Sequence, residues 1–301
     1  MSEARSAAAD HALVEESRVA HPFVDYRVRW KTSGLRPGAF RGVEAGAGDR
    51  MRASVPFGRH GDPRRLDLRA TLRDPFGGLW VREFEQNSAL KIVVLADVSA
   101  SMGYVGRFDK REQLRRIAVA LARSAWRNGD AFGFFAASDV PHDALALPVR
   151  VNRGACDWIS RRLPDFAPRG GSARGLLRLV PRLPHRRALV FLVSDFLWPE
   201  RDVDDVVGAL AHHAVVPVVL RDPAEAERVQ RRGIAVLRDL ETGARRFVWL
   251  RRSLIDRLRH ANTARDQRLA RACRKAGSAP FFVRGRFDPA ALTRYFLESA
   301  A

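Results

Sequence analysis

The chain has 301 residues, of which 46% are hydrophobic and 29% are charged. These proportions are typical of a globular protein and exclude a disordered chain, a collagen-like chain and a disulfide scaffold. Its two cysteines, Cys156 and Cys273, cannot hold a zinc ion by themselves and indicate free buried thiols in a reducing compartment. No apolar run is long enough for a membrane span, and the N-terminus lacks the layout of a signal peptide. We therefore expect a soluble cytoplasmic protein.

The chain is strongly basic, with 53 basic residues, 34 acidic residues and a formal net charge of +19. Nearly all of the positive charge is arginine, because lysine occurs only at positions 31, 91, 110 and 275. The excess is spread along the chain, which favours a GC-rich coding sequence as its origin rather than selection for a ligand. Nucleic acid or an anionic membrane surface is the alternative explanation.

The N-terminal part falls into two segments. Residues 1–20 are small, polar and without a pattern, and we expect them to form a disordered tail. Residues 21–88 contain short alternating stretches, at 24–30 and 79–84, separated by glycine and proline. This pattern predicts a β-rich extension with little hydrophobic core of its own.

From residue 89 to residue 301 strands alternate with helices, which predicts a doubly wound, mainly parallel α/β sheet. Strands are expected at residues 92–96, 131–136, 144–149, 188–193, 214–220 and 280–283. Helices are expected at residues 108–126, 156–163, 173–183, 203–212, 253–275 and 289–297. Residues 234–237 and 246–249 flank a Glu-Thr-Gly turn and are expected to form an antiparallel hairpin.

A carboxylate and two hydroxyls follow the first buried strand: Asp97, Ser99 and Ser101. Their place after a parallel strand puts them at the carboxyl edge of the sheet, where ligand sites of α/β proteins lie. Such hard oxygen ligands suit Mg²⁺, or another divalent cation such as Mn²⁺ or Ca²⁺. A turn with a helix cap would use the same residue types.

Two later segments add to this motif. Gly170, Gly171 and Ser172 open a helix, and Asp195 ends the apolar strand at 188–193. The whole set resembles the metal-ion-dependent adhesion site of von Willebrand factor A domains, which have a Rossmann-like fold. The resemblance implies five metal contacts: Asp97, Ser99, Ser101, Ser172 and Asp195. Ser172 stands where threonine is usual, which keeps the hydroxyl.

The extension carries a longer motif, which begins at Gly61 and Asp62 and continues through Arg65 and Asp67 to residues 81–85. It resembles the signature of the DUF58 family, whose members have a von Willebrand A-like domain and are encoded beside MoxR-type AAA+ ATPases. Leu68 replaces the signature tryptophan. The role of Asp67 is open between a family function and a loop carboxylate that braces the extension on the main domain.

The resemblance implies a metal-dependent protein-interaction adaptor that acts with a MoxR-type AAA+ ATPase in the assembly, activation or metal loading of another protein complex. An acidic residue of this client complex would complete the coordination of the metal. The chain most resembles the family member of methanol-oxidation gene clusters, which makes methanol dehydrogenase the expected client.

Two other functions stay open. The arginine excess suggests an RNA-binding von Willebrand A-like protein, although the arginines between 251 and 274 have the spacing of a solvated helix face. A Mg²⁺-dependent phosphohydrolase would use Asp97, but the sequence lacks a nearby second aspartate, a phosphate-binding loop and a nucleophile elbow. We therefore expect a binding protein rather than an enzyme.

Overall fold

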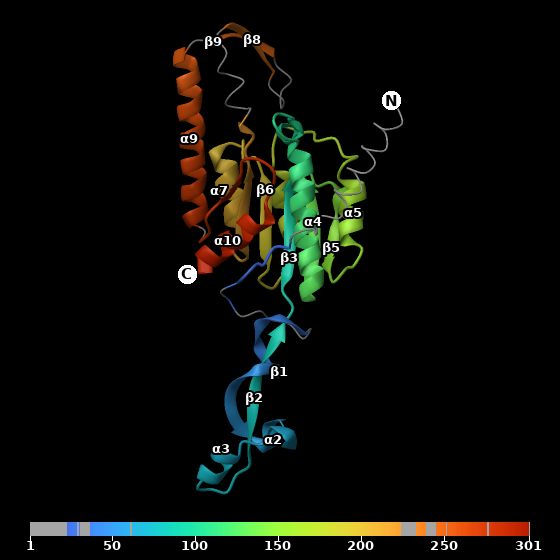
Figure 1. Cartoon of the computed structure of the whole chain (residues 1–301), viewed down its shortest axis with the longest axis vertical. Helices are drawn as coiled ribbons and strands as arrows, with labels where there is room; N and C mark the ends of the chain where they lie inside the picture. The colour runs from blue at the N-terminus through green and yellow to red at the C-terminus, as the bar shows by residue number, and fades with distance from the viewer. Residues whose placement is uncertain are drawn as a thin grey trace, which may run out of the picture.

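A computed structural model of the chain shows two regions, a body and a projecting arm (Figure 1). The described residues are 23–28, 30, 37–60, 62–223, 233–238, 245–250, 252–275 and 277–300. In the body, helices lie on both sides of a central sheet, whereas the arm is a two-stranded ribbon with short helices at its far end. The tail expected at residues 1–20 lies outside the described residues.

The body is built on a sheet of six strands in the order β10-β7-β6-β3-β4-β5. Its strands are β3 (Lys91–Asp97), β4 (Ala131–Ala137), β5 (Leu147–Arg150), β6 (Leu189–Ser194), β7 (Ala214–Leu220) and β10 (Phe281–Val283). All neighbours pair in parallel except the edge strand β5, which pairs antiparallel with β4. The predicted α/β fold with a mainly parallel sheet is confirmed.

The central strands form because their apolar side chains are covered on both faces of the sheet. In β3, every residue from Ile92 to Asp97 is buried. Ile92, Val94 and Ala96 pack into the core on one face, and Val93 and Leu95 pack into the core on the other. The continuous apolar run that predicted this strand therefore reflects two separate cores.

The α-helices of the body are divided between the two faces: α4, α5 and α10 pack on one, and α6, α7 and α9 on the other. Their bounds are α4 (Lys110–Asn128), α5 (Ala155–Arg162), α6 (Gly175–Leu179), α7 (Glu200–Ala209), α9 (Arg252–Lys275) and α10 (Pro289–Ala300). Among the described residues, no helix is both long and apolar enough to cross a membrane.

Two helices differ from their predicted bounds next to prolines. The helix expected over 173–183 is α6 followed by a 3₁₀ turn, Val180–Arg182, because Pro181 has no N–H to continue the α-helical hydrogen bonds. The helix expected from Val203 already begins after Pro199, whose carbonyl accepts hydrogen bonds from the first turn of α7.

The arm consists of β1 (Pro37–Pro56) and β2 (Trp80–Ser88), paired antiparallel with several register shifts. Two short helices, α2 (Phe57–His60) and α3 (Leu68–Arg73), lie at its far end (Figure 1). These strands and helices lie within residues 37–88 of the segment that was expected to be β-rich. The C-terminal half contains the predicted hairpin, formed by β8 (Gly233–Arg238) and β9 (Arg245–Leu250).

The strand expected at 24–30 is wrong, because the described residues of this segment form no strand. Val24 and Tyr26 are buried against α4 and the loop after it: the Val24 N–H donates to Ser124 Oγ (2.9 Å), and the Tyr26 hydroxyl donates to Asp130 Oδ2 (2.6 Å). The alternating pattern therefore arises because every second side chain is buried against the body, and it does not indicate a strand that pairs in a sheet.

Candidate functional site

Three chain segments meet at the carboxyl edge of the sheet. Asp97 ends β3, and Asp195 follows the neighbouring strand β6. The Gly170 carbonyl accepts from the Ala100 N–H (3.0 Å), and the Val98 carbonyl accepts from the Arg169 N–H (3.1 Å). The loop that carries Ser172 is therefore hydrogen-bonded to the loop that carries Ser99.

Asp97 is fully buried and held by several donors. Its Oδ1 accepts from the Ser99 N–H (2.8 Å), while Oδ2 accepts from the Ser194 hydroxyl (2.6 Å) and the Trp198 indole (2.9 Å). Burial, and then the neighbouring charge of Asp195, raises the pKa of Asp97 to about 6. The side chain is fixed in place before any ligand arrives.

The two other residues of the first motif lie beside each other. The hydroxyls of Ser99 and Ser101 are 3.3 Å apart, and both side chains are buried. With Asp97 they form a cluster that presents only oxygen atoms.

Asp195 is paired with a residue that sequence reasoning missed, Lys110. The Lys110 ammonium donates to Asp195 Oδ2 at 2.8 Å, and both side chains are 0% exposed. The ammonium also lies 3.4 Å from the Ser101 carbonyl oxygen and over the Tyr104 ring. Lys110 is the first residue of α4, and the available signal was a lysine in a chain that otherwise uses arginine.

Ser172 lies at the rim of this edge and is half-buried. Its hydroxyl donates to Asp139 Oδ1 (2.8 Å), and the Gly171 N–H donates to the other oxygen of the same carboxylate (3.2 Å). Gly170 has a φ of +94°, and a Cβ there would lie 2.4 Å from Asp139 Oδ2. Glycine is required at 170 for this loop, and Asp139 is a second residue that the sequence did not single out.

The chemistry of Asp97, Ser99 and Ser101 fits a divalent cation such as Mg²⁺, Mn²⁺ or Ca²⁺, since all three are hard oxygen ligands. Asp195 fits it less well, because the Lys110 ammonium already neutralises its charge. In the described part of the chain, no group of three or more His, Cys, Asp or Glu residues could hold a metal ion. Hydroxyl oxygens would therefore have to complete the ligand set.

A hydroxyl and an imidazole also meet near this edge. Ser138 Oγ lies 2.9 Å from His142 Nε2, and burial lowers the pKa of the imidazole. The Ser138 side chain is buried, and the His142 ring packs edge-on against Phe166. These contacts describe a packed structural pair rather than an exposed nucleophile.

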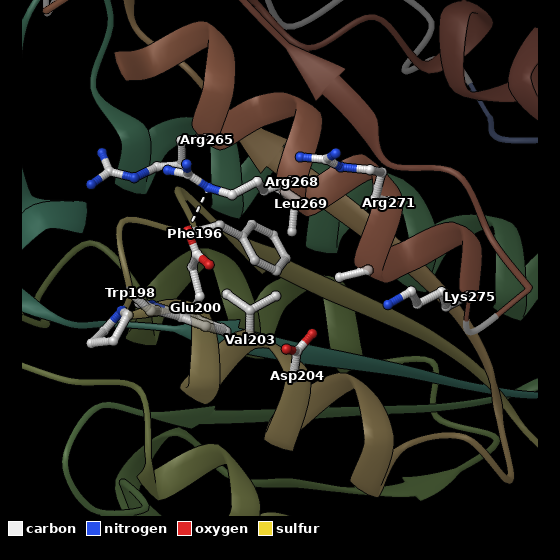
Figure 2. A pocket seen from close by; sticks show the side chains of 12 residues that line it. Phe196, Trp198, Glu200, Val203, Asp204, Arg265, Arg268, Leu269, Arg271 and Lys275 are labelled. Carbon is white, nitrogen blue, oxygen red and sulfur yellow. Dashed lines mark ion pairs between the residues drawn. The ribbon is translucent and has the colours of Figure 1, made fainter.

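A cavity of about 410 Å³ opens between α7 and α9 (Figure 2). Phe196 and Trp198, from the loop after β6, line its apolar part, and Trp198 also donates to Asp97. Phe196 has a φ of 50°, an unusual conformation for an aromatic residue, and its N–H donates to Ser194 Oγ. The cavity wall is thus bonded directly to the Asp97 cluster.

The α9 side of the cavity is cationic. Figure 2 shows four basic side chains on this side: Arg265, Arg268, Arg271 and Lys275. Arg268 pairs with Glu200 of α7 at 2.5 Å. The other three make no ion pair with any residue that the structure describes. This wall therefore has positive charge available for an acidic ligand.

The signature residues of the extension are parts of the arm. Asp62 accepts from the Arg64 N–H and pairs with Arg65 at 3.5 Å. Asp67 caps α3 by accepting from the Ala70 N–H, and its Oδ2 accepts from the Ser54 hydroxyl (2.6 Å). The reading of Asp67 as a brace between extension and body is wrong, since these partners lie in the arm. Gly61 lies outside the described residues.

Both cysteines are free. Cys273 is buried, and burial raises the pKa of its thiol to about 12. Cys156 is half-buried rather than buried. The expectation of free thiols is confirmed, with one of them less enclosed than expected.

Comparison with known proteins places the chain in a family. Two relatives, the uncharacterized proteins Rv1480 of Mycobacterium tuberculosis and Mb1516 of Mycobacterium bovis, are each 25% identical over 260 residues, which are 85% of this chain and 80% of the relative. Among solved structures, the conserved hypothetical protein BatB of Bacteroides thetaiotaomicron is similar over 70% of this chain and 99% of its own, with 15% identity and a TM-score of 0.45. An aerotolerance-related membrane protein of Bacteroides fragilis has 16% identity over 70% of this chain and 99% of its own, with a TM-score of 0.44. Residues 58–270 match the family described as "Protein of unknown function DUF58", and the chain belongs to that family.

Proposed function

We propose that this protein is a metal-dependent protein-interaction adaptor of von Willebrand A type, which acts with a MoxR-type AAA+ ATPase in the assembly, activation or metal loading of a client complex. Methanol dehydrogenase is the candidate client. The observation that carries the proposal is the cluster of Asp97, Ser99 and Ser101, which meets the Lys110–Asp195 pair at the carboxyl edge of the sheet.

Each residue of the cluster has a defined part in this proposal. Ser99 and Ser101 supply hydroxyl oxygens, and Asp97 supplies a carboxylate whose orientation is fixed by Ser194 and Trp198. Ser172 and Asp195 complete the proposed ligand set at its margin. A bound divalent cation would supply open coordination positions for an acidic side chain of the partner.

The cavity beside the cluster supports an acidic partner. Arg265, Arg271 and Lys275 make no ion pair with any described residue, and the largely buried rings of Phe196 and Trp198 line the apolar part of the cavity next to them. An acidic segment with an aromatic or aliphatic side chain matches both features. Since Trp198 contacts both the cavity and Asp97, one partner segment could reach the two sites together.

The test is a pull-down from host lysate with the full chain as bait, run in Mg²⁺ and in EDTA, with Asp97→Ala beside the wild type. The matched control is Asp143→Ala, which removes an exposed carboxylate paired with Arg182. We expect an AAA+ ATPase to be retained by the wild type and the control in Mg²⁺, and to be lost in EDTA and with Asp97→Ala.

Equal retention of the ATPase by Asp97→Ala would remove this cluster from the interaction. Recovery of nucleic acid, with an affinity that falls steeply as salt rises, would favour the RNA-binding alternative instead.

A further inference from the structure

The far end of the arm exposes a group of large apolar side chains. We define the arm tip as α3 and the loop 74–79 that follows it. Its apolar residues are strongly exposed: Phe76 is 92% exposed, Leu72 85%, Leu68 61% and Leu79 51%. Leu68 and Leu72 are one helical turn apart, so they lie on one side of α3. Several large apolar side chains exposed within one short segment usually mark a contact site.

The tip is held in this conformation by Asp74. Its carboxylate accepts hydrogen bonds from the Phe76 N–H (3.1 Å), the Gly78 N–H (2.8 Å) and the Trp80 indole (3.0 Å). A Cβ at position 78 would lie 2.5 Å from Asp74 Oδ2, so any other residue there would displace this carboxylate. The Trp80 N–H donates to Thr71 Oγ1, which ties the loop to α3. The exposed Phe76 is therefore presented by an ordered loop.

The acidic and the basic side chains at the tip differ in their contacts. The carboxylates of Asp67 and Asp74 accept hydrogen bonds from within the arm. Two arginines of the tip, Arg69 and Arg73, and the neighbouring Arg64 are exposed and make no ion pair with any described residue. The outward surface thus combines apolar side chains with unpaired positive charge.

We propose that the arm tip docks on an anionic lipid bilayer, with Leu68, Leu72, Phe76 and Leu79 entering the interface and the arginines contacting acidic headgroups. Apolar side chains next to arginines are the composition of interfacial membrane anchors, and a negative leaflet complements their charge. This inference is independent of the proposed adaptor site, which lies in the body.

The size and shape of the tip favour a bilayer over a protein partner. A stable protein interface uses about 20–30 residues on each side. The tip offers a few side chains at the end of a projecting ribbon (Figure 1). Such a projection can enter a bilayer interface directly, whereas a protein partner would need a matching cavity.

The experiment is co-sedimentation of the full chain with two kinds of vesicle. One kind contains phosphatidylcholine alone, and the other contains phosphatidylcholine with anionic phosphatidylglycerol at roughly a third of the lipid. We expect binding to the anionic vesicles and a loss of at least about tenfold in affinity for Leu72→Ser/Phe76→Ser, because inserted apolar area is removed. The matched control is Trp126→Ser/Leu297→Ser, which changes an exposed aromatic and an exposed leucine of the body. It should bind as the wild type does.

A second pair of variants tests the charges. Arg69→Ser/Arg73→Ser should weaken binding to anionic vesicles by about fivefold per arginine. Arg161→Ser/Arg162→Ser, which removes two exposed arginines of α5, should leave it unchanged. Hydrogen exchange of the amides in residues 68–80 should slow when anionic vesicles are added.

Two results would overturn the proposal. One is vesicle binding that is equal for the wild type and Leu72→Ser/Phe76→Ser. The other is a wild type that does not bind vesicles. If Leu72→Ser/Phe76→Ser then also fails to retain a protein that the wild type retains in the Mg²⁺ pull-down, the tip is a protein interface. Asp97→Ala should bind vesicles as the wild type does, so failure of the adaptor proposal would leave this result intact.

Discussion

The body and the arm are stabilised in different ways. In the body, β3 buries every residue from Ile92 to Asp97 between two layers of helices. In the arm, Val81 is the one buried apolar side chain among those that the structure describes, and polar contacts of Asp67 and Asp74 hold the tip. The body therefore derives its stability from apolar burial, whereas the arm relies on local hydrogen bonds and displays apolar surface outward.

The largest expected effect comes from truncating the same residue type in both regions. Phe191→Ala empties a fully buried position of β6 and should lower the free energy of unfolding by about 3–5 kcal/mol. Phe76→Ala in the arm should change it by less than about 0.5 kcal/mol, because Phe76 is solvated. Urea unfolding measures both, and equal losses would contradict the contrast between the regions.

The Lys110–Asp195 pair is the polar element inside the body. Lys110→Met leaves the buried Asp195 carboxylate without its partner and should cost about 3–5 kcal/mol. Removing this ammonium also leaves room for another cation beside Asp195. If Mg²⁺ binds there in the folded state, millimolar Mg²⁺ should raise the melting temperature of the variant more than that of the wild type. Thermal melts in EDTA and in Mg²⁺ measure this, with Lys91→Met as the control. An equal gain in both proteins would contradict a competition between Lys110 and the metal.

The pH dependence of stability should also trace to the body. Burial raises the pKa of Asp130 to about 6, from 3.8 in the unfolded chain. Because the folded pKa is the higher one, the unfolded state ionises first, and stability falls as pH rises from about 4 to about 6. The loss is on the order of 2–3 kcal/mol. Asp130→Asn should flatten this part of the profile in urea unfolding at several pH values. A fall in stability over this range that is equally steep in Asp130→Asn would contradict the assignment to Asp130.

A smaller and local effect is expected for a carboxylate of the arm. Asp74→Ala removes the acceptor of three hydrogen bonds and should destabilise the tip locally by about 1–2 kcal/mol. Amide exchange of residues 76–80 should accelerate, while the melting temperature of the body stays within error. If the melting temperature of the body fell while amide exchange in the tip accelerated, arm and body would unfold as one unit.

The candidate site was predicted in part from the sequence. Asp97, Ser99 and Ser101 are close in the chain and follow a strong strand signal, so their common location at the sheet edge follows from local pattern and topology. Their contribution to metal binding stays a prediction. Lys110 was not found, since its carboxylate partner lies 85 residues away and helix periodicity carries no information on that pairing. Asp139 and Trp198 were missed for the same reason.

The sequence by itself determined the positions of the strands and helices of the body, apart from the bounds of α6 and α7, because long apolar runs and helical periodicity are local signals that tertiary packing reinforced. It also determined the hairpin of β8 and β9. Tertiary structure decided the rest: that residues 23–28 pack on the body instead of pairing, that Asp195 is neutralised by Lys110, and that apolar residues of α3 face solvent. Each of these outcomes depends on which distant groups meet in space, and residue spacing along the chain does not encode that.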